Sequence, residues 1–413
     1  MTLSPDAARA GIDAKLSELS ALNDYIHANP ELAYEEVKAH DKFFDLLTKL
    51  GFKVTPHAYG VPTSFLAEYG SGGRLVVFNA EYDALPGVGH ACGHNLIATA
   101  SLASFLGVVA AMREAGDSFK GRVQLLGTPA EEGGGGKLKL IDAGAYKGVD
   151  ACLMIHPAPG IKKLPDGTDA SHIRSVANLT MLANVKNKVF FTGRESHAAM
   201  APWQGINALD AVVLGYNGVS MLRQQIRPIE RIHGVLREGG KRPNVTPAHG
   251  ALEYYVRSDT RANAESLWRR VKNCFEGAAV ATGCTVEYEH INSYSDLRAS
   301  PRLCRAYMDA MPKGTVAYKA PTEFSGGSTD MGNVCYECPG FHGAFCIETP
   351  PGVGNHTHGF TASASTKEAF DRSIACGRGM AVAALRVLDD AQFAADVRKD
   401  WEADMELAKV ETK

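Results

Sequence analysis

The chain has 413 residues, 45% of them apolar, and a formal net charge of −3 at pH 7. This size allows about two or three domains, and the near-neutral charge argues against a nucleic-acid-binding surface. The sequence has no apolar run of about 18 residues and no signal-peptide pattern at its start, so we expect neither a membrane span nor secretion. Nine cysteines, an odd number spread along the chain, favour a reduced cytoplasmic protein over a disulfide framework.

The first part of the chain alternates between helix-like and strand-like segments. Apolar residues recur at helical spacing in three stretches, and short apolar runs typical of buried strands separate them. The longest of these helices is expected to end at Gly116. This alternation predicts a partly parallel sheet covered by helices. The first expected helix begins at Pro5, with Ser4 as its cap, and has an apolar face over residues 12–26. The other expected helices and strands span residues 35–50, 63–68, 74–78 and 96–112.

The segment 79–95 joins an expected strand to the long helix and is rich in metal-binding side chains. Cys92 and His94 are two residues apart in a glycine-flanked loop, so both can reach one borderline-soft cation such as zinc or manganese. A buried thiol beside a surface histidine is the alternative for this pair alone. In open α/β sheets, the carboxyl ends of the strands are where ligands gather. The segment holds Glu81, Asp83, His90, Cys92 and His94.

Two further expected strands end in residues of the same kind. The strand at 122–126 leads to the adjacent Glu131 and Glu132, so one carboxylate can bind a metal while its neighbour acts on water as a general base. The strand at 151–155 delivers His156. Taken separately, Glu131 and Glu132 could instead be solvated charges in a turn, and His156 could be a hydrogen-bonded core residue. The coincidence of three such strand ends favours a metal site.

A second pattern begins near residue 186, in the order strand, helix, strand, strand, helix, strand. It predicts a small βαββαβ domain inserted into a larger one, with limits 1–185, 186–299 and 300–413. An exposed sheet edge or helix of this domain would suit a homodimer. Within this domain, His197 and Asn244 are candidate neutral hydrogen-bond donors, and Arg257 is a candidate fixed cation. A role in a turn is the alternative for His197 and Asn244, and a surface ion pair is the alternative for Arg257.

The α/β pattern resumes after residue 300, with a helix at 301–311, a strand at 341–347 and a final helix at 366–388. Between the last two, His356 and His358 could each supply the last metal ligand. Cys335 and Cys338 form an isolated Cys-x-x-Cys pair without the second pair that a zinc ribbon needs. We therefore expect them to be core thiols.

Several of these segments, in order along nearly the whole chain, together resemble one family of enzymes. It is the cocatalytic-metal aminoacylase and carboxypeptidase family (peptidase family M20, subfamily D), in particular the branch of cytosolic dipeptidases for β-alanyl-lysine-type (Xaa-Arg) dipeptides and of aminobenzoyl-glutamate hydrolases. The matching segments are 81–86 (EYDALP), 90–95 (HACGHN), 127–132 (GTPAEE), 196–197 (SH), 207–210 (NALD), 243–244 (PN) and 355–357 (NHT).

The resemblance implies an α/β fold, with a mixed-sheet metallopeptidase catalytic domain and an inserted ferredoxin-like domain that serves as a lid and for dimerisation. It also implies Glu131 as the general base and two divalent metal ions, zinc first, with manganese or cobalt as alternatives. Many relatives have Asp in place of Asn95, and His358 has no counterpart, so neither is assigned as a ligand. The implied metal ligands are Cys92, His94, Glu132, His156 and His356.

The expected reaction is metal-dependent hydrolysis of the amide bond in a dipeptide or N-acyl amino acid. His197, donated by a second subunit, would stabilise the oxyanion, while Asn244 and Arg257 would bind the substrate carboxylate. The expected partners are this small substrate and a second copy of the chain, with no nucleic acid or membrane. An aminoacylase, an amide-forming relative and a catalytically silent binding protein are the alternatives.

Overall fold

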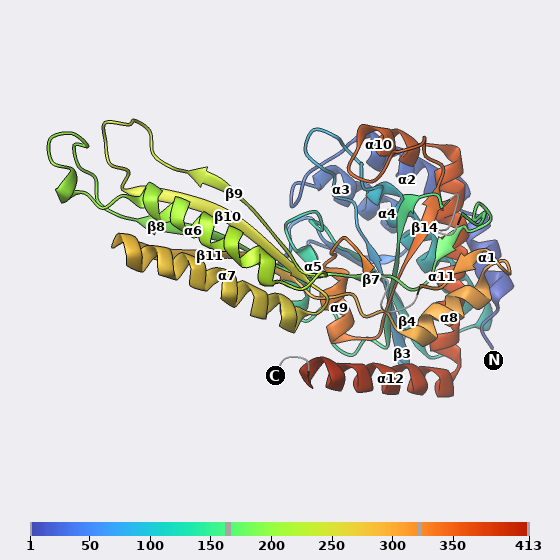
Figure 1. Ribbon diagram of the computed structural model, residues 1–413. Helices are drawn as coiled ribbons and strands as arrows, with labels where there is room; N and C mark the ends of the chain where they lie inside the picture. The colour runs from blue at the N-terminus through green and yellow to red at the C-terminus, as the bar shows by residue number, and fades with distance from the viewer. Residues whose placement is uncertain (1, 162–166, 320–323, 411–413) are drawn as a thin grey trace. The chain divides into compact units, whose positions relative to one another are not determined.

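The computed structural model describes residues 2–161, 167–319 and 324–410 (Figure 1). The chain divides into two compact units. Unit 1 comprises Met1–Thr180, Leu297–Ser325 and Asp330–Glu406. Unit 2 comprises Met181–Asp296, Gly326–Thr329 and Leu407–Lys413, so most of the predicted insertion, 186–299, falls within it.

An eight-stranded sheet forms the centre of unit 1 and has the order β1-β2-β4-β3-β5-β14-β6-β12. Its four central strands, β4, β3, β5 and β14, run parallel, whereas β2 pairs antiparallel with β4, and β1 pairs antiparallel with β2. Their carboxyl ends therefore meet at one edge, and the predicted mixed α/β sheet is confirmed. The strands are β1 Lys53–Pro56, β2 Phe65–Ser71, β3 Arg74–Ala80, β4 Gly121–Gly127, β5 Ala151–Pro159, β6 Ser175–Val176, β12 Val316–Ala317 and β14 Gly340–Ile347.

Two long helices, α4 (His94–Ala115) and α11 (Lys367–Asp389), pack against the parallel strands and against each other (Figure 1). A Cβ on Gly377 would lie 2.9 Å from the carbonyl oxygen of Ala100, so glycine permits their close approach. Helix α4 is long and apolar enough to cross a membrane, but 94% of its apolar window is buried, as in a core helix. The other α-helices of unit 1 are α1 Pro5–Asp13, α2 Leu16–Ala28, α3 Val37–Lys49, α5 Gly136–Asp142, α8 Pro301–Ala310, α9 Met331–Glu337, α10 His358–Ala364 and the greater part of α12 Ala391–Val410.

Two expectations about the terminal helices are wrong. The apolar face at 12–26 is divided between α1 and α2, and the helix at 366–388 is not the last, because α12 follows it. The side chain of Asp390 accepts a hydrogen bond from the backbone N–H of Phe393 at 2.9 Å, and so caps the start of α12. The predicted core thiols Cys335 and Cys338 are both fully buried and free.

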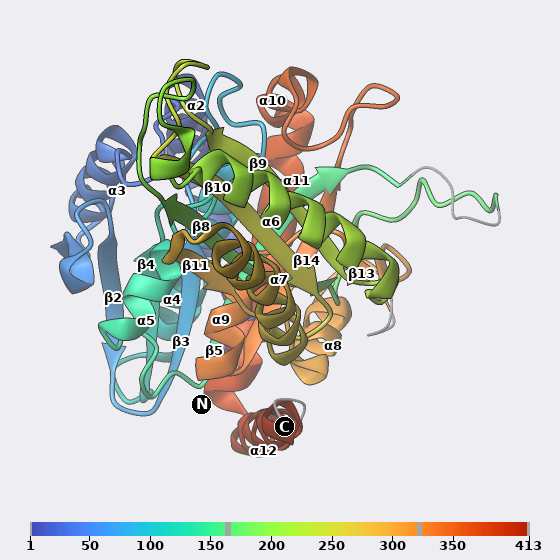
Figure 2. The same cartoon turned by 60° about the vertical axis from the view of Figure 1, so that its left-hand side comes forward.

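Unit 2 has the predicted βαββαβ order, and its sheet is antiparallel throughout, in the order β11-β8-β10-β9. Helices α6 and α7 lie side by side against this sheet (Figure 2). Val212 and Phe275 on these helices pack with Val189 and Leu252 of the sheet, which gives the unit its own apolar core. The elements are β8 Ala183–Thr192, α6 Ala208–Leu222, β9 Arg231–Glu238, β10 His249–Ser258, α7 Arg261–Thr282 and β11 Thr285–Tyr294.

Candidate metal centre

The carboxyl ends of the parallel strands bring together the predicted metal ligands of unit 1. The chain leaves β3 through Glu81 and Asp83 and enters α4 at His94. Gly93 has φ 74°, and a Cβ there would lie 2.6 Å from Cγ of Pro157, so only glycine lets this loop lie against β5. The prediction that His156 follows its strand is wrong in detail, because β5 continues to Pro159.

The five predicted ligands form two groups that share one sulfur. Sγ of Cys92 lies 3.3 Å from Nε2 of His156 and 3.4 Å from Nε2 of His356. Oε1 of Glu132 lies 3.4 Å from Nε2 of His356 and 3.8 Å from Nε2 of His94. Ligand atoms of Cys92, His94 and His156 lie within 4.8 Å of one another, as do those of Cys92, Glu132 and His356. Their role as ligands stays a prediction.

Hydrogen bonds at Nδ1 leave Nε2 of two of these histidines facing the cluster. Nδ1 of His94 donates to Oδ1 of Asp83 at 3.0 Å. Burial lowers the pKa of His94, but the charge and hydrogen bond of Asp83 outweigh it and raise the pKa well above its usual range, so Nε2 becomes an electron-pair donor when a metal replaces its proton. In the same way, Nδ1 of His156 donates to the carbonyl oxygen of Pro157 at 2.7 Å. A carboxylate or carbonyl behind an imidazole is the usual arrangement that orients histidine toward a metal.

Several buried polar atoms of the cluster have no hydrogen-bond partner within the described ranges. They include Nε2 of His94, Oε1 of Glu132 and Oε2 of Glu81. A buried electron-pair donor without a partner is costly, and three that converge require a compensating positive charge. A thiolate, imidazoles and carboxylates form a donor set suited to zinc, manganese or cobalt, so the residues fit the metal that the resemblance implies.

The site shifts the pKa values of its own groups. Burial raises the pKa of the Cys92 thiol, and the charge of Glu132 raises it further. Burial also raises the pKa of Glu131 well above its usual range, with further increases from the charges of Glu81 and Glu132. For Asp83, burial acts upward, but the attraction and hydrogen bond of His94 outweigh it and lower the pKa. Bound cations would favour the ionised thiolate and carboxylates.

The backbone is held in an uncommon conformation on two sides of the cluster. Ala130 and His356 have φ of 63° and 66°, in the left-handed region that side chains other than glycine seldom adopt. The buried carboxyl group of Glu36 accepts a hydrogen bond from the N–H of Ala130 at 2.9 Å and thereby fixes the residue before Glu131. Burial, with help from the charge of Asp83, raises the pKa of Glu36 to about 7. Strain of this kind is concentrated at functional sites.

The three predicted residues of the inserted domain lie in unit 2. His197 and Asn244 are exposed, and their loops are joined by a hydrogen bond from the N–H of Ala198 to the carbonyl oxygen of Asn244 at 3.1 Å. Arg257 donates to Nε2 of His233 at 3.2 Å and to Oγ of Ser328 at 2.8 Å. Within the described part of the chain, no carboxylate forms an ion pair with it, so the surface ion-pair alternative is absent there.

Sequence reasoning missed several residues that support the cluster. Asp83 and Glu81 were counted as metal-type residues without a role, and Lys137 was given no role. Lys137 is fully buried and pairs with Glu81 and with Asp330. Asn95 donates to Oδ1 of Asn23 at 2.9 Å, a structural role that agrees with its exclusion as a ligand.

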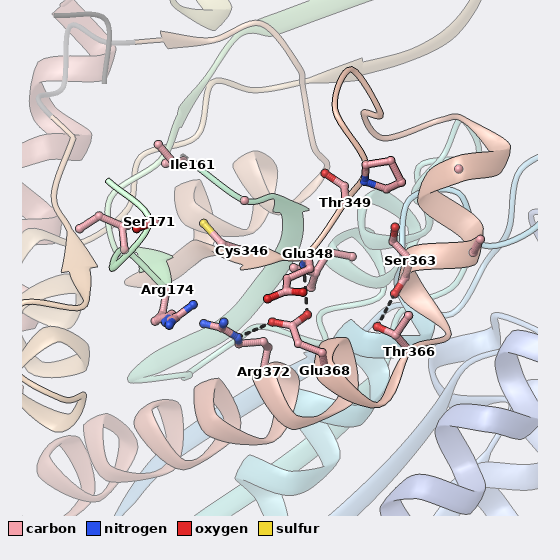
Figure 3. Close-up of a pocket in the computed structure, with 16 residues that line it drawn as sticks. Ile161, Ser171, Arg174, Cys346, Glu348, Thr349, Ser363, Thr366, Glu368 and Arg372 are labelled. Carbon is pink, nitrogen blue, oxygen red and sulfur yellow. Dashed lines mark hydrogen bonds and ion pairs between the residues drawn. The ribbon is translucent and has the colours of Figure 1, made fainter. Parts of the chain in front are cut away.

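A pocket of about 720 Å³ lies elsewhere in unit 1, beyond the ends of β5 and β14 (Figure 3). Arg372 donates to Glu368 at 2.6 Å, and the backbone N–H of Glu348 also donates to Glu368, at 3.1 Å. None of the five predicted metal ligands lines this pocket. Its arginines, Arg174 and Arg372, are matched by two glutamates, so the pocket carries no excess of positive charge for an anionic substrate.

A mixed α/β sheet whose parallel strand ends gather a thiolate, imidazoles and paired carboxylates defines the chain by class as a metallohydrolase. More narrowly, the chain belongs to peptidase family M20/M25/M40, whose model matches residues 77–382. It is therefore a hydrolytic enzyme of a metallopeptidase family, as the resemblance implied.

Individual relatives agree with this assignment. The Xaa-Arg dipeptidase of Mus musculus is 38% identical over 410 residues, which cover 96% of this chain and 91% of the relative. One of the subunits of the p-aminobenzoyl-glutamate hydrolase of Escherichia coli is 32% identical over 294 residues, covering 67% of this chain and 58% of that protein. The fold is similar to that of a dinuclear metal binding peptidase of Bacillus subtilis, with TM-score 0.61, 19% identity and coverage of 91% and 99% of the two chains.

Proposed function

We propose that the chain is a two-metal peptidase that hydrolyses the amide bond of a dipeptide, with an N-acyl amino acid as the second candidate substrate. The observation that carries the proposal is the pair of ligand groups that share Cys92, with Glu131 beside them. The dipeptide comes first because the Xaa-Arg dipeptidase is similar over nearly the whole chain. Zinc is the proposed metal, since a thiolate with imidazoles suits it best, and manganese or cobalt are alternatives.

Glu131 is the proposed general base. Divalent cations held by the five ligands would supply Lewis acidity, which polarises the scissile carbonyl group and makes water easier to deprotonate. The carboxylate of Glu131 would accept the proton of the attacking water and pass it to the leaving amine. Asp83 contributes by orientation, because its two oxygens accept hydrogen bonds from Nδ1 of His94 and, at 2.9 Å, from the N–H of Glu132.

Unit 2 is the proposed lid and the source of substrate contacts. Arg257 and Asn244 would bind the free carboxylate of the substrate, and His197 of a second subunit would donate to the oxyanion. Arg257 supports this role because its guanidinium group donates only to neutral partners in the described structure and keeps donors for a carboxylate.

A homodimer formed through unit 2 is also proposed. Strand β9 lies at the edge of its sheet, and α6 and β9 expose several large apolar side chains, which is typical of an interface. The nine free cysteines support a cytoplasmic location. The exposed apolar residues are Val213, Leu214, Tyr216 and Met221 on α6 and Val235 and Leu236 on β9.

The test is an amine-release assay on a panel of Xaa-Arg, Xaa-Lys and neutral dipeptides, N-acetyl amino acids and p-aminobenzoyl-glutamate, with and without a chelator. We expect dipeptides to release amine and a chelator to stop this release. A preference for N-acetyl amino acids would instead favour an aminoacylase. Amide formation from free amino acids would favour a condensing enzyme. Metal binding without turnover of any substrate would favour a silent binding protein.

A substitution at Glu131 tests whether this residue, and not a neighbouring group, is the general base. Glu131→Gln should keep the metal content and lose about 10²–10⁴-fold in kcat. Glu402→Gln, at an exposed position on α12, is the matched control and should retain full activity. Near-normal kcat in Glu131→Gln would show that another group is the base.

A further inference from the structure

Glu81 is a buried carboxylate of the cluster, and it is not among the five predicted ligands. It is 0% exposed and directly follows β3. Its Oε1 accepts an ion-paired hydrogen bond from Nζ of Lys137, whereas its Oε2 has no hydrogen-bond partner within the described residues. Lys137 therefore anchors Oε1 of Glu81, whereas Oε2 is available to another partner.

The free oxygen faces the metal-binding atom of His94. Oε2 of Glu81 lies 3.6 Å from Nε2 of His94, which likewise has no hydrogen-bond partner among the described residues. This separation is too long for a hydrogen bond between the two atoms, and His94 already donates through Nδ1 to Asp83. Two atoms that bind one zinc ion at about 2.1 Å with a tetrahedral angle lie about 3.4 Å apart. The observed separation is that of two ligands of one cation.

The charges of the ion pairs around Glu81 also favour a cation beside its Oε2. Lys137 also pairs with Asp330, whose Oδ1 accepts from Nζ at 2.6 Å and whose Oδ2 accepts from the backbone N–H of Lys137 at 3.0 Å. Both oxygens of Asp330 are thus satisfied. One ammonium group between two carboxylates balances one of their two negative charges, so the buried carboxylate of Glu81 needs a second cation on its Oε2 side, where Nε2 of His94 lies at 3.6 Å and either a proton on that nitrogen or a metal ion held by it supplies the charge. The unsatisfied oxygen is that of Glu81.

We propose that Glu81, anchored by Lys137, is a sixth cation-facing ligand of the centre and completes the coordination of the ion held by His94. This inference rests on the proposed metal site and adds a ligand to it. Lys137 acts as a positioning residue, because its ammonium group fixes which oxygen of Glu81 faces His94.

The test is titration of chelator-stripped protein with cobalt(II) chloride, followed by calorimetry and by visible absorption, which reports coordination number. Glu81→Gln should bind one of the cobalt ions about 10–100-fold more weakly and change the absorption bands. Asp330→Asn is the matched control, since it also removes one charge beside Lys137. It should leave the spectrum unchanged and the affinity within about threefold, because Asp330 has no free oxygen.

The outcomes separate this inference from the proposed function. If Glu81→Gln and Asp330→Asn weaken cobalt binding equally, or if the absorption of Glu81→Gln is that of the wild type, Glu81 is structural and the inference is overturned. If the wild type binds no cobalt, the proposed metal site itself fails. Where Glu81→Gln does not fold, Glu81→Asp replaces it: this variant keeps the charge but withdraws the oxygen, and unchanged affinity and spectrum would equally overturn the inference.

Discussion

Replacing Asp83 with Asn tests how the site orients its predicted metal ligands. The carboxylate of Asp83 is fully buried and accepts from Nδ1 of His94 at 3.0 Å and from the N–H of Glu132 at 2.9 Å. An asparagine has one oxygen acceptor, so it can satisfy only one of these donors. If its oxygen faces Glu132, its NH₂ group faces His94 and favours the tautomer that is protonated on Nε2, which cannot bind a metal.

The magnitude follows from these contacts. Loss of a carboxylate behind a ligating histidine costs about 10–100-fold in metal affinity, or about 1.4–2.8 kcal/mol. Loss of one charge-assisted hydrogen bond in a buried place should lower the free energy of unfolding of the metal-free protein by about 1.5–3 kcal/mol. Calorimetric titration of stripped protein with zinc gives the first quantity, and urea unfolding gives the second.

A second histidine–carboxylate pair in unit 1 provides the control. Nδ1 of His40 lies 2.8 Å from Oδ1 of Asp41, whose side chain is 66% exposed. Asp41→Asn removes the same kind of interaction at an exposed carboxylate that pairs with none of the predicted ligands, and it should change neither zinc affinity nor stability by more than about 0.5 kcal/mol. Unchanged zinc affinity in Asp83→Asn, with the fold retained, would refute the role assigned to Asp83.

Three further predictions follow from other contacts. Burial, with the charge of the neighbouring His156, lowers the pKa of His342 to about 4 from 6.5. The stability that this group contributes is complete above pH 6.5 and is lost as the pH falls toward 4. Urea unfolding should therefore show that the free energy of unfolding of His342→Asn falls by up to about 3 kcal/mol less than that of the wild type over this pH range. Equal pH profiles for the two proteins would contradict this. Mixed Glu131→Gln and His197→Ala subunits should regain about a quarter of wild-type activity if His197 acts across a dimer, whereas no recovery after confirmed subunit exchange would place it in its own subunit or outside catalysis. Trp401→Phe should lower the free energy of unfolding by about 1 kcal/mol, because Nε1 of Trp401 donates to a backbone carbonyl oxygen at 2.7 Å; an unchanged urea midpoint would count against it.

The fold was predictable where apolar periodicity and turn residues agree. The βαββαβ order of unit 2 and the parallel strands of unit 1 followed from short apolar runs separated by helical patterns. Helix α12 was missed because α11 gives way to it at Asp389 and Asp390 without a glycine or proline to mark a new element. A helix that begins with a capping aspartate gives a weak signal when another helix directly precedes it.

Part of the cluster was predictable from the strands, because Glu132 follows β4 closely and His156 lies in β5, and strand ends converge by topology. The complete set of five ligands followed only from the resemblance of the sequence motifs to those of the family. The supporting residues of the cluster could not be found in this way. Glu36 reaches Ala130 across 94 positions in sequence, and Asp330 reaches Lys137 across 193. A lysine after four glycines is typical of an exposed turn, and only tertiary packing shows that it is buried.

The separation of the ligands along the chain has a consequence for how the enzyme acquires its metal. Cys92 and His356 are neighbours in space but 264 residues apart in sequence. At a synthesis rate of about 5–20 residues per second, roughly 13–53 s pass between the appearance of the first and of the last predicted ligand. During that interval the growing chain presents Cys92 and His94 without their partners, and such an incomplete set binds copper more tightly than zinc. The complete set of predicted ligands therefore becomes available only after residue 356 has been synthesised, and the site can select its ion only from that point on.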